Sequence, residues 1–338
     1  MITYYEYIDF VLYDPQYGYY MRDKEKIGTK GDFITSSNYS DILGKMIAKW
    51  FINQTKEYSL PPVFCELGAG NGRFAKAFME EWYRCCQQRE LTYIIIEKSP
   101  YHIRLQKEQF DKDWNVKYVD HVKDLEMFKG MLFSNELFDA FPVHVIEKNQ
   151  GVLNEIMVAI EDKHLVEKVV PLSNNAIANF IKEYKINLVE GQRIEISLDM
   201  ETMISNISSV LNDGFLVTID YGYSNEEWQE SIRREGSLRG YYQHKLVKNV
   251  LKHPGEMDIT SHIHWDVLEG IGERYNLKKI NRWKQYEFLI DIGILEELEN
   301  HSDHNPFSET NKRNRAIRSL VMPQGISDSF HVLVQKKT

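Results

Sequence analysis

The stretch FCELGAGNGRFA, residues 64–75, decides how the rest of the chain is interpreted. A short apolar run ends at Glu66, and glycines follow at positions 68, 70 and 72. Such a loop lets the backbone approach a nucleotide closely, because glycine has no Cβ and tolerates unusual backbone angles. The stretch therefore predicts a nucleotide site, for which a nicotinamide dinucleotide, a nucleoside triphosphate and S-adenosylmethionine are the candidates.

Strand and helix patterns alternate outward from this loop. Apolar strands are expected at residues 63–67, 92–97, 116–119, 130–136 and 214–220, and helices at 40–58, 71–89, 100–110 and 265–276. Alternation at these lengths predicts βαβ units and a parallel sheet. The remaining patterns predict a β-hairpin around Asn149-Gln150-Gly151, mainly helix over residues 171–212, and an edge strand over residues 329–337.

The chain is thus expected to be an α/β protein with a doubly wound, Rossmann-like sheet, an N-terminal helical segment and an inserted lid or small subdomain. Residues 1–60 would form the N-terminal segment, which is expected to cover the cofactor. The core is expected to comprise residues 61–142, 214–223 and 265–338, and the insertions residues 143–213 and 224–264.

Composition limits the class of protein. The 338 residues are 43 % hydrophobic and 27 % charged, as in a globular protein with a sizeable core. A net charge of −9 argues against a broad nucleic-acid-binding surface. The cysteines, Cys65, Cys85 and Cys86, form no CxxC pair or disulfide framework. No apolar run is long enough to cross a membrane, and no targeting peptide is recognised, so a cytoplasmic protein is expected.

Two details of the loop discriminate between the nucleotides. A triphosphate loop needs Lys and Ser or Thr after its glycines, but Arg73-Phe74 follow here. A dinucleotide fingerprint would place its third glycine at position 73. Glu66 disfavours a pyrophosphate but suits the cationic S-adenosylmethionine. The loop favours that cofactor, with a nicotinamide dehydrogenase and a ligand-free tight turn as alternatives.

Acidic and amide residues end the neighbouring strands. Glu97 follows the second strand, where a carboxylate can accept hydrogen bonds from both ribose hydroxyls. Asp120 ends the third strand and could meet the adenine edge. In MLFSNELFDAFP, residues 131–142, an apolar strand delivers Asn135 and Glu136 to the rim where open α/β sheets bind ligands.

This strand end is expected to carry the chemistry. Asn135 could bind the cofactor or the acceptor nitrogen, and Glu136 could hold a guanidinium or an ammonium group. Asp139 would share that face if a helix begins at Leu137. The alternative for both carboxylates is an ordinary helix N-terminus near the helix dipole.

Three further segments contribute candidate residues. GDFITSS at 31–37 gathers small polar residues around Phe33. IDYGY at 219–223 places Tyr221 at a strand end, and HPGEMDITSHIHW at 253–265 contains Asp258 and His262. His262 and His264 lack partner ligands at the spacing of a metal site, so no metal is predicted.

Together these segments resemble the MidA-like class I methyltransferases, a family that includes the mitochondrial arginine methyltransferase of respiratory complex I assembly. The matching stretches follow the family's order over nearly the whole chain: GDFITSS (31–37), ELGAGNG (66–72), SNELFDAFPVH (134–144), IDYG (219–222), GSLRGYYQHK (236–245), HPGEMDITSHIHW (253–265) and QYEFLIDIGI (285–294).

The resemblance implies a class I methyltransferase sheet and methyl transfer from S-adenosylmethionine to protein, with arginine the leading acceptor. With the residues argued above, the expected cofactor contacts are Gly31, Asp32, Phe33, Thr35, Ser36, Glu66, Gly68, Gly70, Gly72, Glu97, Asp120 and Asn135. The expected catalytic residues are Asn135, Glu136, Asp139, Tyr221, Asp258 and His262. The alternatives are a methyltransferase acting on a small molecule or RNA, and a non-catalytic assembly factor that keeps the fold.

Overall fold

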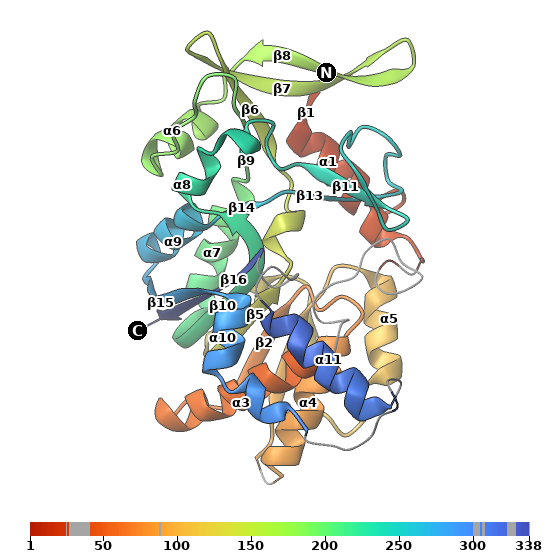
Figure 1. The fold of residues 1–338 in the computed structure, drawn as a ribbon, viewed down its shortest axis with the longest axis vertical. Coiled ribbons are helices and arrows are strands. Elements are labelled where there is room, and N and C mark those ends of the chain that lie inside the picture. The colour runs from red at the N-terminus through yellow and green to blue at the C-terminus, as the bar shows by residue number, and fades with distance from the viewer. Residues whose placement is uncertain are drawn as a thin grey trace. The chain divides into compact units, whose positions relative to one another are not determined.

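The computed structural model describes residues 1–24, 26, 41–87, 89–299, 305, 308–322 and 329–337 (Figure 1). The predicted cofactor residues Gly31, Asp32, Phe33, Thr35 and Ser36 lie outside the described residues. Contacts divide the chain into two compact units. We call Ile34–Glu136, Asn206–Asp220 and Asn276–Thr338 the sheet unit, and Met1–Phe33, Leu137–Ser205 and Tyr221–Tyr275 the N-terminal unit.

The sheet unit is built on one sheet with the strand order β4-β3-β2-β5-β10-β16-β15 (Figure 1). Its strands are β2 (Val63–Leu67), β3 (Thr92–Ile96), β4 (Val116–Val119), β5 (Phe128–Asn135), β10 (Leu211–Tyr223), β15 (Leu277–Lys284) and β16 (Phe330–Lys337). The strands from β4 to β10 pair in parallel, and β15 pairs antiparallel with β16. The chain winds outward from β2 to β4 and then continues on the other side of β2, so the switch point lies between β2 and β5.

Helices α3 (Ile42–Glu57) and α4 (Arg73–Cys85) pack their apolar faces around the start of this sheet. Phe64 of β2 lies 4.1 Å from Phe78 of α4 between ring centroids, and Phe51 of α3 contacts both rings. All three rings are fully buried, and burial of such side chains contributes about 2 to 3 kcal/mol each. The other helices of this unit are α5 (Pro100–Gln109), α10 (Gln285–Asp291) and α11 (Glu309–Val321). The packing of α3 and α4 against β2 holds this strand and the loop that follows it.

The loop after β2 has a left-handed backbone at each of its glycines. The φ angles of Gly68, Gly70 and Gly72 are 71°, 53° and 78°. Gly72 is the N-cap of α4, and a Cβ there would stand 2.7 Å from Gln106 Cγ and 2.8 Å from Gln109 Nε2. The backbone angle thus favours glycine at all three positions, and at Gly72 the close approach of α5 does so as well.

The N-terminal unit contains two smaller antiparallel sheets. In the larger, β7 (Val152–Glu161) pairs with β1 (Ile2–Thr3), β6 (His144–Asn149) and β8 (His164–Pro171), and β6 also pairs with β9 (Arg193–Ile196). In the smaller, β11 (Arg239–Tyr242) lies between β12 (Lys245–Val247) and β13 (Asp258–Thr260). The remaining elements include β14 (Ile263–His264), α6 (Asn175–Glu183), α8 (Asn225–Trp228) and α9 (Trp265–Arg274), and α7 (Asp199–Val210) has residues in both units.

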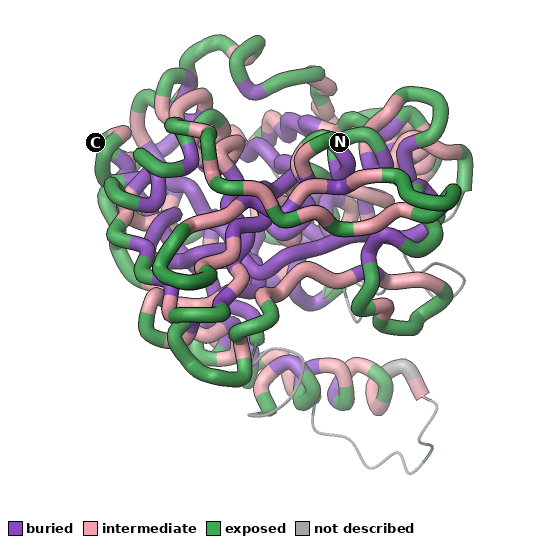
Figure 2. The backbone as a smooth tube through the Cα atoms, turned by 90° about the horizontal axis from the view of Figure 1, so that it is seen from above, coloured by how far each residue is buried: buried purple, intermediate pink, exposed green. Residues whose placement is uncertain are grey.

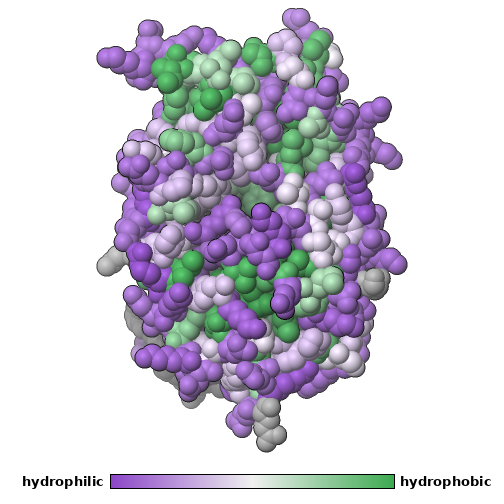
Figure 3. Space-filling view, turned by 180° about the vertical axis from the view of Figure 1, so that it is seen from behind, coloured by the Kyte–Doolittle hydropathy of each residue, from purple (hydrophilic) through white to green (hydrophobic). Residues whose placement is uncertain are grey.

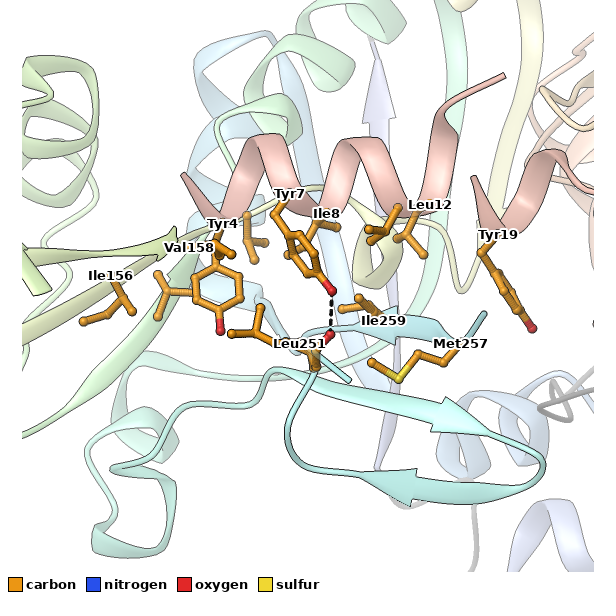
Figure 4. Packing of buried hydrophobic residues seen from close by; sticks show 14 residues of the cluster. Tyr4, Tyr7, Ile8, Leu12, Tyr19, Ile156, Val158, Leu251, Met257 and Ile259 are labelled. Atoms are coloured by element: carbon orange, nitrogen blue, oxygen red, sulfur yellow. Dashed lines mark hydrogen bonds between the residues drawn. The ribbon is translucent and has the colours of Figure 1, made fainter. Parts of the chain in front are cut away.

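Helix α1 (Tyr4–Tyr13) forms the core of this unit with the strands (Figure 4). Thr3 and Glu6 form a reciprocal capping box at its start. One face buries Tyr4, Tyr7, Ile8 and Leu12 against residues that include Ile156, Val158, Leu251 and Ile259. The Tyr7 hydroxyl donates a hydrogen bond to the Val250 carbonyl at 2.9 Å, which satisfies a buried polar group.

The structure confirms the predicted strands and the hairpin and corrects three other expectations. Residues 171–212 are not mainly helical, because β9 separates α6 from α7. The segment 329–337 is not an edge strand, since β16 lies between β10 and β15. The helix expected over residues 71–89 is shorter, and α4 ends at Cys85.

In the described part of the chain, no helix is both long and apolar enough to cross a bilayer. Figure 2 shows buried stretches in purple inside the elements and exposed green stretches at the turns. On the face drawn in Figure 3, hydrophobic residues form separate groups among hydrophilic ones, as is usual for globular proteins.

We predict that Gly72→Ala lowers the free energy of unfolding by about 2 to 3 kcal/mol, because it adds backbone strain and disturbs the contacts of Gln106 and Gln109. The matched control is Gly151→Ala, which has a φ of 76° but nothing within 4 Å of the added Cβ. This control should cost only about 1 kcal/mol of strain. Urea denaturation measures the free energy of unfolding of both variants. Equal decreases would show that the close approach of α5 does not add to the cost at Gly72.

Candidate functional site

Hydrogen bonds from the neighbouring strand end and helix fix the glycine loop. The Gly70 amide donates to Glu97 Oε2 at 2.8 Å, and the Ser99 amide donates to Glu97 Oε1 at 2.8 Å. From α5, Gln106 Nε2 donates to the Gly70 carbonyl at 2.6 Å, and Gln109 Nε2 donates to the Asn71 carbonyl. Each Glu97 oxygen keeps a second lone pair, so Glu97 can still accept the hydroxyls of a ribose.

Glu66 is a buried carboxyl directly before this loop. Its side chain accepts a hydrogen bond from the Tyr93 hydroxyl at 2.7 Å, and the residue is 4 % exposed. Burial raises the pKa of Glu66 to about 8, against the lowering effect of the Tyr93 hydrogen bond, and the charge of Glu97 adds to the increase. A neighbouring cation would favour its ionised form. The carboxyl is therefore suited to a ligand that brings a positive charge.

The register of the sheet brings other predicted residues to the same edge. Leu67 lies opposite Ile96 and Ile96 opposite Val119, so the residues after them, Glu97 and Asp120, end neighbouring strands. Asp120 is exposed. Both strands end at the edge where open α/β sheets bind ligands.

Asn135 and Glu136 reach this edge from the other side of the glycine loop. Leu67 also lies opposite Ser134, which places the following Asn135 beside the start of the loop. Glu136 has a φ of 50°, an uncommon angle for a residue with a side chain, and its amide donates to the Ile219 carbonyl at 2.9 Å. Asn135 Nδ2 donates to Glu136 Oε1 at 3.2 Å. The left-handed angle ends the strand and redirects the chain.

The helix expected from Leu137 is absent at that position. A single 3-10 turn, η3 (Phe138–Ala140), follows instead, with Leu137 as its N-cap. The prediction that Asp139 shares a helix face with Glu136 is therefore wrong. The physical reason is the positive φ of Glu136, which breaks the periodicity on which the prediction depended.

A second group of predicted residues lies together in the N-terminal unit. Asp139, which is 4 % exposed, accepts a hydrogen bond from the Tyr221 hydroxyl. The Ser261 amide donates to the Asp139 carbonyl at 2.9 Å. The Arg239 guanidinium lies 5.0 Å from the centre of the Tyr221 ring, and its Nη2 lies 3.4 Å from His262 Nε2. Asp139, Tyr221 and His262 thus form one polar cluster with Arg239.

Burial governs the charges in this cluster. It raises the pKa of Asp139 to about 6, although the Tyr221 hydrogen bond and the Arg239 charge act in the opposite direction. It lowers the pKa of His262 to about 2, and the charges of Arg239 and Arg233 add to this effect. His262 is therefore a neutral imidazole, stacked on Tyr223 at 4.4 Å between ring centroids.

Asp258 is paired with Tyr20 in the N-terminal unit. It is 3 % exposed and accepts a hydrogen bond from the Tyr20 hydroxyl at 2.6 Å. Tyr20 stacks on Tyr13, whose hydroxyl donates to the Ala140 carbonyl at 2.8 Å. No cluster of three or more His, Cys, Asp or Glu side chains that could hold a metal ion is present among the described residues.

Sequence reasoning missed several residues that support these groups. Gln106, Gln109, Tyr13, Tyr20 and Arg239 were not singled out, although Arg239 stands in the GSLRGYYQHK stretch. Their roles depend on contacts across long sequence separations. A polar residue within a helix, such as Gln106, carries no signal of its own in one sequence.

The strand order and the left-handed glycine loop define a Rossmann-like, class I methyltransferase fold. Two crystal structures of Burkholderia thailandensis proteins share this fold. The form bound to S-adenosylhomocysteine has a TM-score of 0.89 at 24 % identity, with 99 % of this chain and 88 % of that chain covered. The native form has a TM-score of 0.86 at 23 % identity, with 99 % of this chain and 87 % of that chain covered.

The chain belongs to a family of S-adenosyl-L-methionine-dependent methyltransferases, whose profile matches residues 46–281. S-adenosylmethionine is thus its methyl donor, as the glycine loop predicted. The residues present fit this cofactor, because the three left-handed glycines leave positions 68, 70 and 72 of the loop without a Cβ, beside a buried carboxyl. When bound, the cofactor supplies a methyl group on a positively charged sulfur.

Curated proteins of similar identity also match the chain. A Drosophila melanogaster protein is 24 % identical over 301 residues, which cover 79 % of this chain and 66 % of the relative. A human protein is 26 % identical over 324 residues, with 87 % and 70 % covered. They are named protein arginine methyltransferase NDUFAF7 homolog and protein arginine methyltransferase NDUFAF7, both mitochondrial. These names contradict the expectation of a cytoplasmic protein, which we therefore withdraw.

We predict that Glu66→Gln stabilises the free protein and weakens cofactor binding. A carboxyl whose pKa is raised on folding costs stability once the pH exceeds its unfolded pKa. The gain should therefore grow from pH 5 to pH 8 and reach about 1 to 3 kcal/mol at neutral pH. The affinity for S-adenosylmethionine should fall about 10- to 100-fold, because a charged interaction is lost.

Glu81→Gln is the matched control for this substitution. Burial acts to raise the pKa of Glu81, but Arg84 and Lys49 outweigh it and hold the pKa below its usual value. This control should destabilise the protein and leave cofactor affinity unchanged. Thermal denaturation and calorimetric titration measure both quantities. A Glu66 variant with unchanged affinity would remove Glu66 from the cofactor site.

We also predict that Tyr221→Phe raises the pKa of Asp139 above about 6, because the variant loses the hydrogen bond that stabilises the carboxylate. Carbon-13 NMR of aspartate-labelled protein follows the titration, and Asp139→Asn identifies the resonance. An unchanged Asp139 pKa in the Phe variant would show that this hydrogen bond does not govern the carboxyl.

Proposed function

We propose that this chain transfers a methyl group from S-adenosylmethionine to an arginine side chain of a protein. One structural observation carries the proposal: Asn135 and Glu136 end the strand next to the glycine loop, and Asn135 Nδ2 orients the Glu136 carboxyl. The names of the curated relatives support arginine as the acceptor.

The chemistry of arginine explains why a carboxylate is needed there. A guanidinium is a planar cation that pairs with a carboxylate through two parallel hydrogen bonds. Such a pair orients one nitrogen as the nucleophile and keeps the acceptor in place. During transfer a nitrogen–carbon bond forms, a carbon–sulfur bond breaks, and the nitrogen releases a proton. We assign the orienting role to Glu136 and a supporting role to Asn135.

The remaining assignments follow from the chemistry of the groups. Glu66, Gly68, Gly70, Gly72, Glu97 and Asp120 are proposed to bind the cofactor, and Gly31, Asp32, Phe33, Thr35 and Ser36 to cover it. Asp139, Tyr221, Asp258 and His262 are proposed to serve the acceptor side of the reaction. Asp139 suits proton transfer near neutral pH because its pKa is about 6. We also propose that the N-terminal unit recognises the acceptor.

A protein acceptor suits the charge of the chain better than RNA does. The net charge of −9 repels a polyanion and attracts a basic, arginine-containing protein. The carboxylates of Glu97, Asp120 and Glu136 at one edge of the sheet act in the same direction.

We predict that Glu136→Gln retains cofactor affinity and loses methylation by at least about 100-fold, because the neutral amide cannot pair with a guanidinium. The measurement is transfer of a radiolabelled methyl group to proteins of a cell lysate, followed by acid hydrolysis and detection of methylarginine. Glu126→Gln, an exposed carboxyl in another part of the unit, is the control and should be fully active.

The fraction that carries the label tests the proposed function. Label in methylarginine supports it. Label in RNA or small molecules would instead identify another acceptor, and cofactor binding without any transfer would indicate an assembly factor. A Glu136→Gln variant as active as the parent would remove Glu136 from the mechanism.

A further inference from the structure

An exposed aromatic pair stands on the outer side of α1. Phe10 and Tyr17 are each 52 % exposed, and their ring centroids lie 6.4 Å apart. The opposite side of the helix is the buried face that packs against the strands. Solvent-exposed aromatic rings in contact with each other are typical of interaction surfaces.

A fixed turn brings the two rings together. After α1, Asp14 Oδ1 accepts hydrogen bonds from the amides of Gln16 at 2.9 Å and Tyr17 at 2.8 Å. The Gly18 amide then donates to the Asp14 carbonyl at 2.8 Å, and a Cβ at Gly18 would stand 2.6 Å from the Asp14 nitrogen. The turn therefore holds Tyr17 against Phe10 before any partner arrives, which reduces the entropy cost of binding.

Carboxylates stand near Phe10 along the chain. Glu6, one turn before Phe10 on the same side of α1, is exposed, and so is the adjacent Asp9. Asp14, which ends the helix, holds the turn through the amides of Gln16 and Tyr17. Residues 1–21 contain no lysine or arginine. The first cationic side chain is Arg22, which lies at Gly255 on the side of the Tyr17 carbonyl. We call Glu6, Asp9, Phe10, Asp14 and Tyr17 the aromatic–acidic stripe.

We infer that the aromatic–acidic stripe docks an arginine-rich segment of the protein acceptor, outside the arginine that is methylated. Guanidinium groups stack on aromatic faces and pair with carboxylates, so both features of the stripe suit the same side chain. Charge complementarity selects a basic peptide. This inference rests on the proposed function, because it assumes a protein acceptor that contains arginine.

The test measures peptide binding in the absence of cofactor and turnover. The probe is a synthetic peptide of alternating glycine and arginine, with a glycine–glutamine peptide as the neutral comparison. The full chain should bind the arginine peptide, and Phe10→Ala/Tyr17→Ala should bind it about tenfold more weakly, as expected from two lost cation–π contacts. Phe10→Leu/Tyr17→Leu keeps apolar surface but removes the ring faces. Its affinity for the arginine peptide should therefore also fall about tenfold.

Two further variants test whether peptide binding depends on this surface and on its charge. Ile160→Ala, at a residue that is 75 % exposed elsewhere in the unit, should bind like the parent. Asp9→Asn should weaken binding about twofold and reduce its dependence on salt. Unchanged thermal denaturation and S-adenosylhomocysteine binding show that each variant is folded.

Several outcomes would overturn the inference: no binding by the parent, equal binding of the glutamine peptide, or full binding by either double variant. A parent dimer that dissociates in Phe10→Ala/Tyr17→Ala would assign the stripe to contacts between copies. The outcome is separable from the proposed function. Label in RNA or small molecules would reject the proposed function and with it the docking of a protein acceptor, whatever the peptide binds. Methylarginine formation together with unchanged peptide binding by the double variants would reject docking alone.

Discussion

The left-handed backbone of the loop after β2 is the constraint on which the cofactor site depends. Three glycines with positive φ turn the chain so that the Gly70 amide meets Glu97 at the end of β3. The same turn begins α4 and leaves room for Gln106 of α5. A Cβ at any of the three glycine positions would strain this left-handed backbone. The ends of β2, β3 and β5 are therefore arranged by an element that only glycine can form at low cost.

The charge of this edge suits a methyl donor better than a dinucleotide. Glu66, Glu97, Asp120 and Glu136 follow or end the strands around the glycine loop. Together they repel a pyrophosphate and attract cations. Both substrates of arginine methylation are cationic, so one acidic edge suits the cofactor and the acceptor. Burial raises the pKa of Glu66 to about 8, so a cation beside this carboxyl would favour its charged form.

Local patterns in the sequence predicted the fold class and the strand ends that make up the candidate site, whereas the contacts between distant residues were missed. The strands beside the glycine loop are buried and apolar, so their periodicity is clear. Strand β15 is mostly exposed and lysine-rich, and its structure depends on pairing with β16. The positive φ of Glu136 and the joining of Asp139, Tyr221 and Ser261 have no local signal, because these residues meet only after distant segments fold together. The sequence resemblance named the segments but not their contacts.

The central claim is that the glycine loop and the acidic strand ends form the cofactor site. A crystal structure of this chain with saturating S-adenosylhomocysteine tests it most directly. We predict density along Gly68–Gly72, with the ribose hydroxyls on Glu97 and the amino group of the homocysteine end near Glu66. Density at another place, or an empty loop at a ligand concentration that saturates binding in solution, would contradict the account.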